Sequence, residues 1–286
     1  MKPRNLILLT TLPTLFYLFF WLFYPFIYDI YYSAFYFTLT RPELTRFVGV
    51  ENYIDVLTDP NFWLAARNTA LFIVICLPLE FFLGLLLALV LSSDFKGIGI
   101  LRTLYILPVL LPPVSVAIIW RLMFFPKMGA INYLIEALFG AEINWLAGGM
   151  PSFIAVVLID VWQWAPFVAL ILLAGLLGMP PEPIEAAKID GASPSQIFFN
   201  ITLPYLRPII LVALMLRFLD LIKLFDPIYA IVTGGGSGLE TLSIFIYRRG
   251  FKVLNIGFGA TVSVIFWITA FIIANLVVRR FKEYLT

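Results

Sequence analysis

The chain has 286 residues, of which 62% are hydrophobic and only 13% charged, and its mean hydropathy is +0.99. A soluble domain of this length could not bury so much apolar surface, so the composition predicts a membrane protein. The formal net charge of +2 gives no reason to expect a nucleic-acid partner. The sequence has no histidine, a single cysteine (Cys76, in an apolar run) and no GxxxxGKS or GxxxxGKT phosphate loop. We therefore expect no disulfide framework, no metal site, no bound cofactor and no ATP hydrolysis on this chain itself.

The first predicted membrane span covers residues 6–28. Leu6–Tyr28 carries no charge and exceeds the roughly 20 residues that a helix needs to cross a bilayer. The segment is longer than the core of a signal peptide, and no small-x-small cleavage site follows it. We therefore expect a retained helix with a cytoplasmic N-terminus. The outer loop that follows, Asp29–Arg67, is predicted to hold short amphipathic helices around Asp59-Pro60.

The next two predicted spans cover residues 68–91 and 103–125. Glu80 interrupts the second span, and we expect its carboxylate to accept a hydrogen bond from a neighbouring helix. The loop Ser92–Arg102 between the two spans is basic and is predicted to be cytoplasmic. The pair Pro112-Pro113 lies inside the third span and predicts a bend, because proline removes a donor from the helix.

A second outer loop, Pro126–Pro151, is predicted to carry Trp145 at its membrane-interface end. The fourth span covers residues 152–179. Its interior polar and aromatic side chains are Asp160, Trp162, Gln163 and Trp164. Because polar groups are expensive in lipid, these side chains mark the fourth span as a place where function concentrates.

The fifth span, residues 208–232, is the one that hydropathy supports least, because four charged residues interrupt it. They are Arg217, Asp220, Lys223 and Asp226. Their spacing of three places them on one stripe of a helix, where each has an opposite charge one turn away. The stripe must face protein or water, since unpaired charge in lipid costs several kcal/mol. A glycine-rich outer loop, Thr233–Phe251, then leads to an uncharged sixth span at residues 257–278.

The loop at residues 180–207, between the fourth and fifth spans, is predicted to form two short helices joined by a tight turn. Four residues suit the first turn of the first helix: Pro181, Glu182, Pro183 and Glu185. That helix is expected to end at Asp190-Gly191, because glycine adopts the left-handed conformation that closes many helices.

The second helix of this loop has a complete start signal. Ser193 is predicted to be its N-cap, Pro194 its first residue, and Gln196 the third residue of a capping box. Leu203-Pro204 is predicted to end it. The loop is therefore interpreted as a rigid helical hairpin.

Six spans put both termini on one side of the membrane. Basic residues are denser in the loops on that side, which predicts that it is the cytoplasm. The cytoplasmic set is Lys2, Arg4, Lys96, Arg102, Lys188, Arg207, Arg279, Arg280 and Lys282. The outer set is Arg41, Arg46, Arg67, Lys127, Arg248, Arg249 and Lys252. We predict an all-α polytopic protein of the cytoplasmic membrane, with residues 1–286 as one domain and the hairpin inside the cell.

The hairpin resembles the EAA loop of ATP-binding-cassette importer permeases. The matching positions are Glu185, Ala186, Ala187 and Gly191, followed after nine residues by Ile201, Leu203 and Pro204. Segments 47–69, 95–124 and 233–251 resemble the carbohydrate branch of that family, and the last resembles the outer loop of the first of two paired permeases, akin to the maltose and glycerol-phosphate permeases. Ser237 stands where that loop usually has proline.

The resemblance implies a type I importer transmembrane domain with a cytoplasmic coupling hairpin, in the membrane of a prokaryote. A second, similar permease, two ATPase subunits that hold ATP and Mg²⁺, and an extracytoplasmic sugar-binding protein would be its partners. The hairpin, including Asp190, would contact the ATPase, and its movement would drive alternating access. Sugar import is the function that this resemblance implies.

The same resemblance places the solute contacts in the fourth and fifth spans. They are predicted at Asp160, Gln163, Trp164, Phe167, Leu221, Ile222 and Phe225. A carboxylate beside aromatic rings suits sugars, whose hydroxyls donate hydrogen bonds while their C–H faces stack on rings. Asp160 could instead make a structural hydrogen bond. Lys223 and Asp226 are predicted to form a gate or an ion pair with each other or with the partner permease.

Two other classes of protein remain open from the residues alone. An ion-coupled secondary transporter of a small polar solute would account for Glu80, Asp160, Asp220 and Asp226 as intramembrane carboxylates. A membrane-embedded enzyme is disfavoured, because the sequence offers no cluster of metal ligands and no pairing of a nucleophile with a base.

Overall fold

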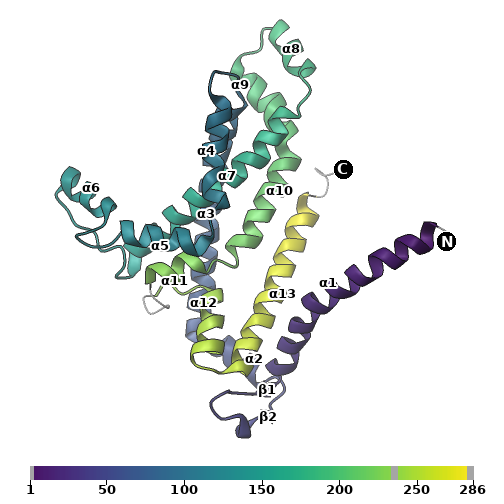
Figure 1. The fold of residues 1–286 in the computed structure, drawn as a ribbon, viewed down its shortest axis with the longest axis vertical. Coiled ribbons are helices and arrows are strands. Elements are labelled where there is room, and N and C mark those ends of the chain that lie inside the picture. The colour runs from purple at the N-terminus through teal and green to yellow at the C-terminus, as the bar shows by residue number, and fades with distance from the viewer. Residues whose placement is uncertain (1–2, 233–237, 282–286) are drawn as a thin grey trace. The chain divides into compact units, whose positions relative to one another are not determined.

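The computed structural model describes residues 3–232 and 238–281 (Figure 1). The predictions for Lys2, for Lys282 and for Thr233–Ser237 of the glycine-rich loop lie outside the described residues. The chain divides into two compact units. The first comprises residues 1–63 and 245–269, and the second comprises residues 64–244 and 270–286.

The first unit gathers around the end of α1 (Pro3–Ser33). The short strands β1 (Phe35–Tyr36) and β2 (Arg46–Phe47) pair antiparallel, with Phe35 opposite Phe47, and a 3₁₀ turn at Pro42–Leu44 lies between them. Helix α2 (Glu51–Thr58) is held to this end by Asn52, whose amide donates to the carbonyl oxygens of Ser33 and Phe35 at 2.8 and 2.9 Å. A 2.6 Å ion pair joins Asp59 to Arg249 in the π-helical turn Arg248–Lys252.

The second unit is built around α7 (Gly149–Leu177). The other helices that lie wholly or partly in it are α3 (Pro60–Ser92), α4 (Ile98–Leu110), α5 (Pro113–Met123), α6 (Ala130–Phe139), α8 (Glu182–Ile189), α9 (Pro194–Ile197), α10 (Leu203–Leu221), α11 (Asp226–Val232), α12 (Leu242–Tyr247) and α13 (Ile256–Phe281). Helix α7 packs against α4, α5, α10 and α11, and Figure 1 shows α4 and α10 running alongside it. It is therefore the central helix of this unit.

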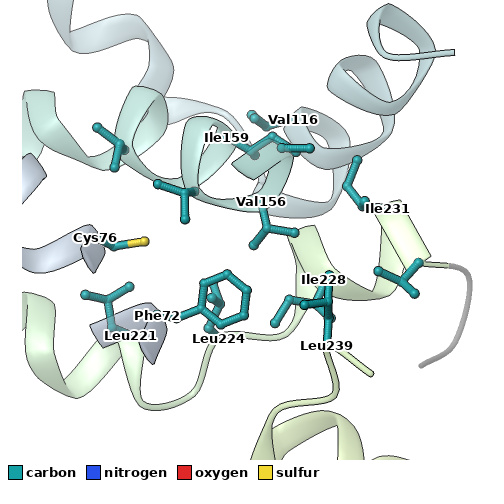
Figure 2. Packing of buried hydrophobic residues seen from close by; sticks show 14 of the residues in the cluster. Phe72, Cys76, Val116, Val156, Ile159, Leu221, Leu224, Ile228, Ile231 and Leu239 are labelled. Atoms are coloured by element: carbon teal, nitrogen blue, oxygen red, sulfur yellow. The ribbon is translucent and has the colours of Figure 1, made fainter. Parts of the chain in front are cut away.

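The apolar core of the second unit brings together helices that are far apart in sequence (Figure 2). Phe72 from α3, Ile159 from α7 and Ile228 from α11 are each fully buried in it. Cys76 is buried in the same core, as expected of a small apolar side chain. Burial of several such side chains, each contributing about 1.5–3 kcal/mol, fixes α7 and α11 next to each other.

The all-α membrane architecture predicted from the sequence is confirmed. Five helices in the described residues are long and apolar enough to cross a bilayer: Thr10–Ser33, Pro60–Ser92, Gly149–Leu177, Pro194–Leu221 and Ile256–Arg279. The pair α4 and α5 supplies a sixth span if the two are taken together. Their axes differ by 95° across the break at Leu111-Pro112. The predicted bend in the third span is thus a full interruption, because Pro112 and Pro113 have no N–H to continue α4.

Five local predictions about helix ends and loops differ from the structure. The helix of the first span continues to Ser33, and α3 begins at Pro60 rather than after Arg67. The fifth span is broken, since α10 ends at Leu221 and α11 begins at Asp226. Trp145 is buried in the core, and its indole N–H donates to Asn132 at 3.0 Å. It therefore binds the loop to α6 instead of anchoring it at a lipid interface.

The predicted helix end at Leu203-Pro204 is the fifth, and it is wrong. Helical backbone runs without a gap from Pro194 to Leu221. A π-helical turn at Phe198–Thr202 precedes the proline, and the N–H of Leu203 bonds to the carbonyl of Phe198, five residues back. The wider turn accommodates Pro204, which would interrupt a regular α-helix at this point.

Candidate functional site

Three charged side chains from three helices meet inside the second unit. Arg217 of α10 donates from Nε and Nη2 to the two carboxylate oxygens of Glu80 on α3, at 2.6 and 2.7 Å. Its Nη2 also donates to Asp160 of α7 at 3.1 Å. All three side chains are at most 2% exposed. Because a buried charge needs partners, each helix holds the next in place through Arg217.

The network continues from Arg217 to a solvent-accessible edge. Asp220 lies 3.8 Å from the guanidinium of Arg217 and 3.5 Å from the ammonium of Lys223. The indole of Trp164 lies under the same guanidinium, with 4.8 Å between Arg217 Cζ and the ring centre. The guanidinium plane is therefore occupied by carboxylates at its edge and by an aromatic ring on its face.

A cavity of about 250 Å³ opens at this edge of the network. It is lined by Pro113, Asp160, Gln163, Trp164, Arg217, Asp220, Lys223, Leu224, Phe225, Asp226 and Pro227. These residues come from α5, α7, α10, α11 and the break between the last two. The breaks in the third and fifth predicted spans thus supply its walls, as irregular backbone inside a membrane protein lines polar cavities.

The hairpin forms a second polar site, which follows the C-terminal end of α7 (Figure 1). Helix α8 ends in a Schellman motif: the N–H of Gly191 bonds to the carbonyl of Lys188 at 3.1 Å, and the N–H of Ala192 bonds to that of Ala187 at 2.9 Å. Gly191 has φ of +78°, a conformation that strains residues with a Cβ. The predicted end of this helix is confirmed.

The predicted start of the next helix is also confirmed. Ser193 is the N-cap of α9, its side chain accepts from the N–H of Gln196, and Gln196 Oε1 accepts from the N–H of Ser193 at 2.7 Å. Helix α8 has no buried residue, and Ile189 is 86% exposed. A rigid hairpin that leaves a large apolar side chain uncovered is suited to dock onto another protein.

Comparison with known families identifies the chain. Residues 80–286 match the family described as "Binding-protein-dependent transport system inner membrane component". The chain belongs to this family. It is a permease component of an ABC transporter, and the resemblance predicted from the EAA residues is confirmed at the level of the family.

The permease is similar to several sugar permeases. It is 39% identical over 240 residues to the trehalose/maltose transport system permease protein MalF of Thermococcus litoralis, covering 83% of this chain and 81% of that one. It is 34% identical over 243 residues to the trehalose transport system permease protein SugA of Mycobacterium tuberculosis H37Rv, covering 85% and 78%.

A solved structure shares the fold. The permease superposes on a chain of the bacterial alginate ABC transporter, crystallised with a periplasmic protein bound to an alginate pentasaccharide. The TM-score is 0.86 at 21% identity, and the match covers 100% of this chain and 96% of that one. The fold is therefore that of an ABC importer transmembrane domain.

The structure places the predicted site residues in two groups. Six of them line the cavity: Asp160, Gln163, Trp164, Lys223, Phe225 and Asp226. Three do not: Phe167 packs edge-on against Trp164 with ring centres 6.1 Å apart, Leu221 is in the apolar core, and Ile222 is buried. Asp160 accepts a hydrogen bond from Arg217, which is the structural role that the sequence analysis gave as an alternative. Glu80 accepts a hydrogen bond from the same side chain on another helix, as predicted.

Two charged cavity residues, Arg217 and Asp220, were not predicted as site residues, nor were Pro113, Leu224 and Pro227. Lys223 pairs with Asp220, and no ion pair joins it to Asp226 in the described residues. Arg217 could have been found from the sequence. Glu80 and Asp160 are carboxylates inside other spans and need a buried cation as partner. Arg217 is the first charge in the fifth span and is a candidate for that cation.

Proposed function

We propose that this permease imports a sugar or sugar derivative as one of two paired permease subunits of an ATP-driven importer. The observation that carries the proposal is the polar cavity, which combines hydrogen-bonding carboxylate and amide groups with the rings of Trp164 and Phe225. Such a lining suits a solute with many hydroxyls and apolar C–H faces. Relatives named as trehalose and maltose permeases support the same solute class.

The proposed solute contacts are the predicted residues that line the cavity. Asp160 keeps acceptor capacity beyond its bond to Arg217, since a carboxylate has about four lone-pair sites. Trp164 and Phe225 offer ring faces or edges for stacking. Phe167, Leu221 and Ile222 do not line the cavity and would instead support the side chains that do.

The hairpin is proposed to couple this chain to its motor. The residues that would contact the ATPase, or hold the hairpin in the shape that does so, are Glu185, Ala186, Ala187, Asp190, Gly191, Ile201, Leu203 and Pro204. Two ATPase subunits would hold ATP and Mg²⁺, so that this chain needs no cofactor, and closure of the ATPase pair would push on the hairpin. A binding protein outside the membrane would deliver the sugar.

The proposed topology is that of one domain, residues 1–286, in the cytoplasmic membrane of a prokaryote. Its spans would lie at about 6–28, 68–91, 103–125, 152–179, 208–232 and 257–278, the third interrupted at Leu111-Pro112 and the fifth between Leu221 and Asp226. Both termini and the loop 180–207 would lie in the cytoplasm. The excess of basic residues on that side supports this orientation. Labelling of single cysteines introduced into the loops, from the two sides of intact vesicles, tests it.

Transport by the reconstituted complex tests the function. The permease, a second permease, the ATPase and the binding protein are placed in proteoliposomes with radiolabelled trehalose or maltose outside. We expect uptake that needs both ATP and the binding protein. Uptake that runs on an ion gradient, with no ATPase present, would contradict the proposal and favour a secondary transporter.

A further inference from the structure

A second cavity, of about 480 Å³, lies in the second unit and shares no lining residue with the polar cavity. Its walls come from three helices: Leu77 of α3, one face of α10, and Ala274 and Val277 of α13. Apart from Arg207, the described residues that line this groove are apolar. A sugar fits such walls poorly, because they offer almost no groups for its hydroxyls to bond.

The face that α10 turns to the groove is a regular helical stripe. It consists of Arg207, Ile210, Leu211, Leu214, Met215 and Phe218. Steps of three and four residues over three turns are those of one face of an α-helix. The stripe therefore carries a cation at its first position and apolar side chains at every later one.

The length of the stripe corresponds to one leaflet of a bilayer. From Arg207 to Phe218 the helix rises about 16 Å, at about 1.5 Å per residue. The hydrocarbon core of a bilayer is about 30 Å thick, so the groove reaches roughly to its middle. There it ends next to the buried ion network, since Phe218 is adjacent in sequence to Arg217.

The cation at the open end of the groove is available to a ligand. Arg207 is exposed, and no hydrogen bond or ion pair engages its side chain within the described part of the chain. Arg279 is also exposed and lies two residues after Val277, and the sequence continues with Arg280. In the proposed topology these arginines are at the cytoplasmic surface, where anionic lipids attract basic residues.

We infer that this groove binds one anionic phospholipid of the cytoplasmic leaflet, with an acyl chain along α10 and the phosphate at Arg207. The fork of N–H donors on a guanidinium matches the oxygens of a phosphate group. The apolar stripe gives the chain a surface of the right depth. An apolar helix of a neighbouring subunit could cover the same walls, but it would leave Arg207 without an anion.

The lipid would support the helix that leads to the hairpin. Helical backbone runs without a gap from Pro194 to Leu221, so α10 is continuous with α9. A chain that fills the space between α3, α10 and α13 braces this helix from one side. Because a ligand that binds only the folded state stabilises it by mass action, the bound lipid raises the melting temperature.

Lipid binding to the purified transporter complex tests the inference. The complex is stripped of lipid in detergent and titrated with dioleoyl phosphatidylglycerol or dioleoyl phosphatidylcholine, which have the same chains. Native mass spectrometry counts the bound lipids. We expect the wild type to prefer phosphatidylglycerol, and Arg207→Met to weaken its binding roughly 5-fold with little effect on phosphatidylcholine. Without added lipid the two complexes should melt alike, so that the loss is not one of folding.

A groove-filling variant tests the apolar part of the site. Ala274→Phe occupies the space of about two methylene groups of the chain and should weaken both lipids roughly 10-fold. Two matched controls should bind like the wild type. Lys96→Met removes an exposed cytoplasmic charge that does not line the groove. Leu276→Phe enlarges an exposed side chain of α13 that does not line it either.

Equal binding of the two lipids by the wild type, or an unchanged affinity in Arg207→Met, would overturn the inference. So would phosphatidylglycerol that binds this permease alone and is lost when the second permease is present, because the partner would then cover the groove. Failure of the proposed function is a separate result, since absence of sugar uptake would leave these lipid counts unchanged.

Discussion

The cavity and the hairpin are two polar regions of this permease, and they are built in opposite ways. At the cavity, Arg217 bonds to Glu80 and Asp160, which are 137 and 57 residues away in sequence. In the hairpin, every bond that shapes the turn joins residues at most five apart. Arg217, Glu80 and Asp160 are buried, whereas α8 has no buried residue.

The difference suggests what each region can tolerate. Removing one member of a buried ion network leaves the others without a partner inside an apolar core. The exposed hairpin can lose a bond to water and keep the rest of the fold. Substitutions in the buried part of the network should therefore affect folding as well as transport, and substitutions in the hairpin should affect communication with a partner.

The largest effect is expected at Arg217. Arg217→Met leaves Glu80 and Asp160 buried without their cation, and we expect a loss of about 3–5 kcal/mol of stability. The fraction of folded permease after heating in detergent measures it. Arg207→Met is the matched control on the same helix, because Arg207 is exposed and makes no ion pair in the described residues; it should melt like the wild type.

A smaller effect is expected at Gly191. Gly191→Ala forces a Cβ into the left-handed conformation, which costs about 1–2 kcal/mol and shifts the end of α8. The permease should fold normally, while its association with the ATPase, measured by co-purification, should weaken. Gly99→Ala adds the same methyl group to α4, where it meets no atom, and should leave association unchanged. Equal association in both variants would show that the hairpin does not couple.

The cap of α9 should matter less. Ser193→Ala removes one side of the capping box and should destabilise the hairpin by about 1 kcal/mol. Hydrogen exchange of the amides in α9 should then accelerate several-fold, without a change in α7. Ser263→Ala, whose hydroxyl bonds only within α13, should alter neither. Unchanged exchange in α9 after loss of Ser193 would contradict the role of the capping box.

The smallest effect on stability is expected at Lys223. Its ion pair with Asp220 is 3.5 Å long and both side chains are well exposed, so Lys223→Met should change stability by less than about 1 kcal/mol. The thermal melt should overlay the wild type. A loss as large as that of Arg217→Met would mean that the edge of the network is as critical as its buried centre.

The contrast between local bonds in the hairpin and long-range bonds at the cavity also explains which features could be predicted from the sequence. The hairpin was predicted almost in full, because its caps, prolines and Gly191 act within a few residues of one another. The one miss there, the helix end at Leu203-Pro204, arose because a π-helical turn relieves the proline. The number of candidate spans followed from hydropathy and the bend at Pro112-Pro113 from its prolines, whereas the break near Ile222–Phe225 was not predicted.

The cavity was predicted only in part. Polar residues of the fourth span pointed to it, and Asp160, Gln163 and Trp164 do line it. Which cation would meet Glu80 and Asp160 depends on how three helices pack, and a single sequence does not contain that information. The solute contacts assigned to Leu221 and Ile222 rested on resemblance, and the structure buries both side chains.

The central claim is that the cavity selects the solute and the hairpin couples transport to ATP. The most direct test measures sugar imported per ATP hydrolysed, together with the preference between trehalose and its deoxy analogues, in proteoliposomes carrying Gln163→Met or Gly191→Ala. We expect Gln163→Met to change the preference, and Gly191→Ala to lower the sugar-to-ATP ratio while the preference stays intact. A Gly191→Ala complex that changes preference while keeping the ratio would contradict it.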